Sequence, residues 1–209
     1  MLHLGGGGAS GSNGIGTAAN DITGQIPALY PPSGWVGNLF GPGYYIEATI
    51  SFDPSGADAS NWPGLWGNTF FSYFNNANVG GVELDWAGMR AGGLSVPAYD
   101  MALRDWTPGN DPIVASNNDA TPLPAGWDWS AMHTYAVLCV PSQENGGQGY
   151  CQTYADGKPY YRLNWTALGQ WSRLDATPIG FIMNPPDNSS LNVGAVRIFV
   201  KDASHVIRR

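Results

Sequence analysis

The chain has 209 residues, which suits one large all-β domain. Its 29 Gly and 16 Pro are too many for a helical protein, and only 12% of its residues are charged, about half the usual share. A net charge of −7 without any run of basic residues argues against nucleic acid as a partner. An anionic polymer would be repelled on average, whereas a neutral polymer fits.

The N-terminal end, with four consecutive glycines, predicts a flexible lead-in (1–20) to a single domain that spans 1–209. No charged segment followed by an apolar one marks a signal peptide in this chain, and no apolar run is long enough to predict a membrane span. The low charge and the polar loops rich in Gly and Asn nevertheless favour a secreted or extracellular protein.

Short apolar or alternating runs, bounded by Gly, Pro, Asn and Asp, recur along the chain, and no long segment shows a helical period. We expect strands at 43–52, 69–74, 81–88, 133–140, 150–163, 178–184 and 193–202. Residues 98–106 are expected to form one or two helical turns. The pair Asp156-Gly157 predicts a hairpin turn. This pattern is typical of an all-β sandwich or jelly roll.

The strand at 81–88 carries two acids, Glu83 and Asp85, separated by one residue. Alternate residues of a strand lie roughly 6.6 Å apart and point the same way. Retaining glycoside hydrolysis needs a carboxylate nucleophile and a second carboxyl about 5–5.5 Å away as the acid/base. The alternative explanation is a polar strand face whose carboxylates are satisfied by neighbouring donors.

Tryptophans form a second candidate group, since rigid aromatic rings are expected to line a sugar cleft. The candidates are Trp62, Trp66, Trp86 and Trp106, taken from the nine Trp of the chain. Any one of them could equally belong to the core of a sandwich.

Cys139 and Cys151 flank the turn-rich segment 140–150. A hairpin there would bring the two strands within disulfide reach, so the pair is either a disulfide or two buried thiols.

Seven segments from about residue 40 onward resemble, in order, the motifs of glycoside hydrolase family 16, in the concanavalin A-like lectin/glucanase superfamily. They are "FGPGYYIEATISF", "NWPGLWGN", "VELDW", "MHTYAVLCVP", "CQTYADGKPY", "PIGFIMN" and "LNVGAVRIFVKD". The resemblance implies a concanavalin A-like β-sandwich of two antiparallel sheets with a concave carbohydrate cleft. It also implies a retaining endo-hydrolase of β-linked glucans or galactans.

Carried over by position, the resemblance makes Glu83 the nucleophile and Asp85 the carboxylate that holds and tunes it. Trp62 and Trp66 would lie near the cleft, and His133 near the catalytic strand, as substrate-binding residues.

The family's second catalytic Glu falls at position 87 in the regular strand or 88 in its bulged version, and these are Ala87 and Gly88 here. Neither donates a proton, and because a general acid contributes on the order of 10²–10⁴-fold, the family mechanism cannot run unmodified. A substitute acid would have to be Glu47, Asp100 or Asp105. Otherwise the chain is a catalytically inactive, lectin-like carbohydrate-binding module on the same fold.

No cofactor is predicted. The three His lack metal-ligand spacing, and Gly194 stands where the family has the Asp of its cation site, so a structural calcium has no support in the sequence. Legume-type lectins also carry an E-x-D strand, which binds Mn²⁺ and Ca²⁺. Their further Asp and His ligands have no clear counterpart in this chain, and the segment 109–112 ("GNDP") resembles them only weakly. A purely structural domain is the remaining alternative.

Overall fold

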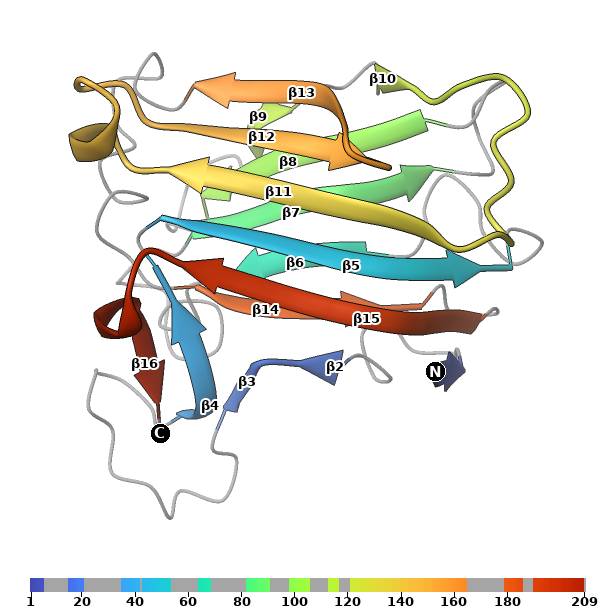
Figure 1. The fold of residues 1–209 in the computed structure, drawn as a ribbon, viewed down its shortest axis with the longest axis horizontal. Helices are drawn as coiled ribbons and strands as arrows, with labels where there is room; N and C mark the ends of the chain where they lie inside the picture. Colours follow the sequence, from blue (N-terminus) through green and yellow to red (C-terminus); the bar gives the residue numbers. More distant parts are fainter. Residues whose placement is uncertain are drawn as a thin grey trace.

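The computed structural model describes residues 1–5, 15–20, 35–41, 43–53, 64–68, 82–90, 98–105, 113–116, 121–164, 179–185 and 190–208. Over these ranges the chain forms two large antiparallel sheets, called sheet A and sheet B, and a small third sheet. Sheet A lies in front of sheet B in Figure 1, with the third sheet at the lower left.

Within the described ranges, the strands of sheet A are, in spatial order, β1 (Leu2–Gly5), β15 (Ser190–Val200), β5 (Tyr44–Phe52), β11 (His133–Val140), β12 (Tyr150–Ala155) and β13 (Lys158–Asn164). Those of sheet B are β10 (Thr121–Pro122), β8 (Ala98–Asp105), β7 (Val82–Arg90), β6 (Gly64–Asn68), β14 (Gly180–Asn184) and β2 (Ile15–Gly16), and β9 (Ile113–Ser116) also pairs with β8. The third sheet contains β16 (Val206–Arg208), β4 (Trp35–Phe40) and β3 (Ala18–Asn20). The architecture is the β-sandwich that the strand pattern predicts.

The core lies between the two large sheets. In β5, Ile46, Ala48 and Ile50 are buried, whereas Tyr45 and Glu47 point to the outer face of sheet A. This alternation follows from the two-residue period of a strand. The inward side chains of β5 belong to one apolar cluster with Leu65, Leu84 and Trp86 of sheet B. Each large sheet therefore has one face on the core and one face turned away from it.

The hairpin between β12 and β13 turns at Asp156-Gly157, as predicted. Both residues have positive φ, 47° and 75°, which is the conformation of a two-residue type I′ turn. On the inner face of the preceding strand pair, Cys139 and Cys151 lie directly opposite each other and form a disulfide.

The structure departs from two sequence-based expectations. Residues 98–105 are not helical: they form β8, because pairing with β7, β9 and β10 outweighs the helix propensity of Ala, Met, Leu and Arg. The first 20 residues are not only a flexible lead-in, since β1 pairs with β15 and β2 pairs with β14. The predicted strand at 69–74 lies outside the described residues.

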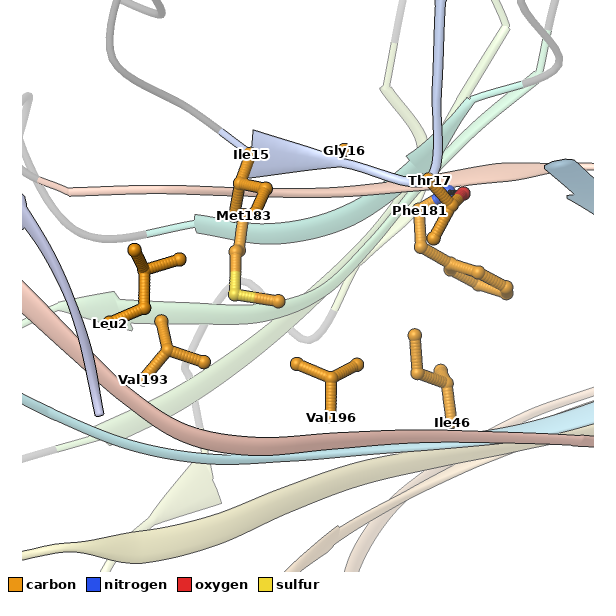
Figure 2. Close-up of a pocket in the computed structure, with 9 residues that line it drawn as sticks. All are labelled: Leu2, Ile15, Gly16, Thr17, Ile46, Phe181, Met183, Val193 and Val196. Carbon is orange, nitrogen blue, oxygen red and sulfur yellow. Dashed lines mark hydrogen bonds between the residues drawn. The ribbon is translucent and has the colours of Figure 1, made fainter. Parts of the chain in front are cut away.

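The core is open at one edge of the sandwich, between β1 and β2. Figure 2 shows Ile15, Phe181 and Met183 of sheet B facing Leu2, Val193 and Val196 of sheet A across an apolar groove. The volume of the groove is about 190 Å³. Leu2, Ile15 and Val196 are exposed. β1 and β2 are short, and among the described residues neither sheet has a further strand beyond them.

Candidate functional site

The central strand of the candidate site is β7. Leu84 and Trp86 are 0% and 1% exposed and belong to the core, whereas Asp85 between them is half-buried. Strand alternation thus places Asp85 on the outer face of sheet B. Glu83 lies in the same strand, two residues before Asp85, and its place follows from the backbone register of β7.

A β-bulge follows Asp85. On one side, Asp85 is opposite Trp66 and Ala87 is opposite Leu65, so Trp86 is an extra residue in β7. On the other side, the pairing jumps from Asp85 to Gly88. A bulge of this kind shifts the phase of the strand by one residue. Because Leu65 faces the core, Ala87 shares the inward phase, and Gly88 returns to the phase of Asp85.

The register aligns residues of three neighbouring strands in rows across sheet B. Trp66 of β6 is directly opposite Asp85 and is also half-buried. Asn68 and Arg104 are opposite Glu83 on its two sides. In the third row, Gly88 has Gly64 on one side and Asp100 on the other. Glycine inside a strand often marks a bulge, as here, or a place where a ligand or another backbone comes close.

Trp86 is not a substrate-binding residue, in contrast to the sequence-based hypothesis. Its ring is fully buried between the sheets, because the residue after an outward-facing Asp85 points inward. Trp62 and Trp106 lie outside the described residues, so the roles assigned to them stay predictions.

Glu47 is not a substitute acid for Glu83, because the core separates the two faces on which Glu47 and Asp85 lie. Its carboxylate accepts hydrogen bonds from Arg197 Nη1 at 2.7 Å and from the Tyr45 hydroxyl at 2.9 Å. The bond from Arg197 is the main cause that lowers the pKa of Glu47, so the group is held ionised.

Asp105 is opposite Val82 at the far end of the β7–β8 pair and is out of phase with Asp100, five residues earlier in β8. Asp100 is the candidate acid that the register brings beside Gly88.

His133 begins β11 and is held from two sides. Its Nδ1 lies 2.7 Å from Asp156 Oδ2, its Nε2 lies 3.1 Å from the Asp128 carbonyl oxygen, and its ring stacks on Trp127 with centroids 3.8 Å apart. These contacts connect the β12–β13 turn to the segment before β11. The sequence reasoning missed both aspartates as partners of His133, although the Asp156-Gly157 turn was the available signal.

Within the described residues, no group of three or more His, Cys, Asp or Glu side chains could hold a metal ion. In that same part of the chain, no helix is long and apolar enough to cross a membrane.

No family model and no curated protein matches the sequence. Solved structures do match over most of the chain. An endo-β-1,3-glucanase from Pyrococcus furiosus is 18% identical with a TM-score of 0.52, covering 90% of this chain and 74% of that one. An endo-1,3-β-glucanase from Streptomyces sioyaensis is 16% identical with a TM-score of 0.54, covering 91% and 77%.

The chain has the concanavalin A-like fold. The same fold is matched by an alginate lyase solved with an alginate tetrasaccharide, at 12% identity and a TM-score of 0.51, over 99% of this chain and 80% of that one. Similarity at this level of identity describes the sandwich and leaves the chemistry to the residues on it.

Proposed function

We propose that the chain binds a neutral β-linked polysaccharide, a β-glucan or galactan, across the outer face of β6, β7 and β8 and cleaves it with retention of configuration. The observation that supports this most directly is the register after the bulge. Glu83, Asp85 and Gly88 then have the same phase along β7, and Asp100 of β8 is directly opposite Gly88. The endo-1,3-β-glucanases that share the fold make a β-glucan the first substrate to test.

Asp100 is the proposed proton donor. Residues directly opposite each other in an antiparallel pair project from the same face, with Cβ atoms about 4.5–5.5 Å apart. A carboxyl at position 100 therefore emerges next to the place where the family's acid would emerge from position 88. The two glycines of this row, Gly64 and Gly88, leave room for a sugar close to the sheet.

In the proposed reaction, a Glu83 carboxylate oxygen attacks the anomeric carbon of the bound sugar. The bond from this carbon to the glycosidic oxygen breaks, and Asp100 donates its proton to the leaving oxygen. Water then attacks the covalent glycosyl ester while the Asp100 carboxylate takes a proton from it, which releases the sugar and restores Glu83.

The other residues of the rows position these groups. Arg104 is directly opposite Glu83 in β8, and we propose that it helps to hold the nucleophile in place. Asp85 holds the nucleophile from the same strand. Trp66, opposite Asp85, offers an aromatic surface for a sugar ring. Trp62 and Trp106 remain proposed substrate contacts. His133 begins a strand of sheet A, opposite the buried Ile50, so the substrate-binding role that the sequence suggests for it does not fit the outer face of sheet B.

The experiment compares Asp100→Asn with Asp105→Asn, a control in the same strand but out of phase. On a β-1,3-glucan, Asp100→Asn should lower kcat/KM by about 10²–10⁴-fold. On an aryl glycoside with a good leaving group, which needs no protonation, it should lower the first step far less. Glu83→Gln should abolish both activities. Equal loss in both Asp variants, or none in either, would refute the assignment of Asp100.

A second candidate function is a binding module without turnover, and Gly88 in place of a proton donor is the observation that favours it. This function requires a wild-type protein that is retained on a neutral polysaccharide but releases no reducing ends, with retention weakened in Trp66→Ala. Release of reducing ends by the wild type, lost in Glu83→Gln, would rule it out.

A polymeric substrate and a disulfide both fit a protein that works outside the cell, because disulfides persist in oxidising compartments. We therefore propose that the protein is secreted. Fractionation of cells that produce the protein should find it in the medium with Cys139 and Cys151 protected from thiol labelling, and protein that stays in the cytosol with free thiols would contradict the proposal.

A further inference from the structure

The outer face of sheet A, away from the proposed cleavage site, carries a group of aromatic rings. Phe199 of β15 and Tyr45 of β5 are directly opposite each other, with ring centroids 5.9 Å apart. Tyr154 of β12 lies on the other side of Tyr45 at 6.4 Å. We call Tyr45, Tyr154 and Phe199 the outer aromatic patch. Phe199 is 55% exposed although it belongs to the longest described strand.

A shallow pocket of about 230 Å³ adjoins the patch. Tyr45, Leu138 and Phe199 contribute to its apolar side, and Glu144 and Lys201 contribute polar groups. The volume is below the roughly 300–1,000 Å³ of pockets for drug-sized molecules, so it suits a single small ring. The pocket thus combines an exposed aromatic ring with hydrogen-bonding groups beside it.

The charges around the patch cancel in pairs. Lys201 Nζ lies 2.8 Å from Glu144 Oε1, and Arg197 Nη1 lies 2.7 Å from Glu47 Oε1. Each pair offers donors and acceptors without a net charge. Because the charges cancel within each pair, a charged ligand gains no net attraction here, and a neutral hydroxylated ligand suits the hydrogen-bonding groups and the apolar ring.

The patch is held on a rigid support. Leu138, next to Tyr45 in the same cross-strand row, is flanked along β11 by Val137 and Cys139, which point inward. Cys139 is covalently fixed to β12 through Cys151. Little ordering of the protein is then needed when a ligand binds, which favours affinity. An exposed Phe on this outer face contributes little to the core, so its place there fits a surface contact.

We propose that the outer aromatic patch is a second glycan-binding site, where one sugar ring of a neutral polysaccharide stacks on Phe199 and hydrogen-bonds to Glu144 and Lys201. The site is separated by the core from the face on which β7 would cleave the chain. It would hold the polymer to the protein whether or not cleavage occurs, and only the choice of a β-glucan as the ligand rests on the proposed function.

The first test is affinity electrophoresis in native gels that contain a soluble β-1,3-glucan. Phe199→Leu keeps an apolar side chain but removes the ring, and should weaken the apparent affinity about tenfold. Phe199→Tyr keeps the ring and should bind as the wild type does. Met132→Ala, which shortens another exposed apolar side chain, is the matched control and should change nothing.

The second test maps the amide chemical shifts of labelled protein during titration with oligosaccharides of the same glucan. Shifts should appear at Tyr45, Phe199 and Lys201 in addition to any at β7, and they should persist in Glu83→Gln. The titration can therefore be interpreted even if the protein does not cleave the glucan. The proposal is overturned if Phe199→Leu binds like the wild type, or if shifts are confined to β6–β8. It is equally overturned if alginate is bound as well as the neutral glucan, or if neither glycan is bound.

Discussion

At the scale of single residues, the chemistry of the candidate site depends on position 88. The bulge after Asp85 gives Gly88, rather than Ala87, the phase of the outer face. Position 88, where the resemblance to glycoside hydrolase family 16 would place the acid, therefore carries no side chain, although it has the phase of Asp85 and is opposite Asp100. A carboxyl introduced there should be able to reach the same substrate as Glu83.

In the Asp100→Asn variant, which lacks the proposed acid, a further Gly88→Glu change should raise kcat/KM on a β-1,3-glucan by up to about 10²–10⁴-fold, the usual contribution of a general acid. Ala87→Glu is the matched control, because position 87 is opposite the buried Leu65, and it should give no gain and lower the melting temperature. Reducing-sugar assays and thermal unfolding measure both. No gain from Gly88→Glu in the Asp100→Asn background, with the fold intact, would count against catalysis at this face.

Tyr44 shows how a single polar atom can cost stability. Its ring packs edge-on against Phe181 in the core, and burial raises the pKa of its hydroxyl far above the usual range. Among the described residues, this hydroxyl has no hydrogen-bond partner. A buried donor without a partner costs about 1–3 kcal/mol.

Tyr44→Phe should therefore raise the free energy of unfolding by about 1 kcal/mol, as measured in urea titrations. Tyr45→Phe, one residue on, should bring no such gain because the Tyr45 hydroxyl donates to Glu47 on the outer face. A loss of stability in Tyr44→Phe would mean that the hydroxyl has a partner after all.

At the scale of elements, hairpins follow local sequence closely, whereas β8 does not. The Asp156-Gly157 turn requires residues that tolerate positive φ, so the identity of these two residues was enough to predict it. The residues of β8 favour a helix on their own, and only their partners in β7 and β9 make them extended. The disulfide joins β11 to β12 and so links the two strands of this hairpin in sheet A covalently.

Replacing both Cys139 and Cys151 by Ser should lower the free energy of unfolding by about 3 kcal/mol, since the bond closes a loop with a sequence separation of 12. Denaturant unfolding of the double variant measures this. Reduced wild-type protein should unfold like the double variant, and an unchanged midpoint in both would contradict a stabilising disulfide.

At the scale of the whole molecule, hydrogen bonds across sheet A and within loops hold several carboxylates in their ionised form. The pKa values of Glu47, Asp128 and Asp202 are lowered, mainly by hydrogen bonds from Arg197, Ser130 and Ser204. A group whose pKa is lower in the folded state stabilises the fold above its ordinary pKa, 4.5 for Glu47 and 3.8 for the two Asp. That stabilisation is lost as the pH falls through the folded-state pKa.

We therefore expect the melting temperature to be steady near neutral pH and to fall below about pH 4.5. Glu47→Gln should be less stable than the wild type by about 0.5 kcal/mol near neutral pH, as is usual for an exposed ion pair. This difference should shrink as the pH falls below 4. Thermal unfolding from pH 7 to pH 3 measures both curves, and a gap that stays constant would show that the Glu47 charge is not responsible.

The sequence by itself determined the all-β class, the strand at 81–88 with its two acids, the Asp156-Gly157 turn and the Cys139–Cys151 hairpin. These features depend on residues that are neighbours in the chain. Only the tertiary structure decided that the strand after Asp85 is bulged, that Trp86 is core and that Glu47 lies on the opposite face. It also decided that Asp100 stands beside Gly88. These outcomes depend on the register between strands far apart in sequence, which is set by joint packing of both sheets and leaves no local pattern.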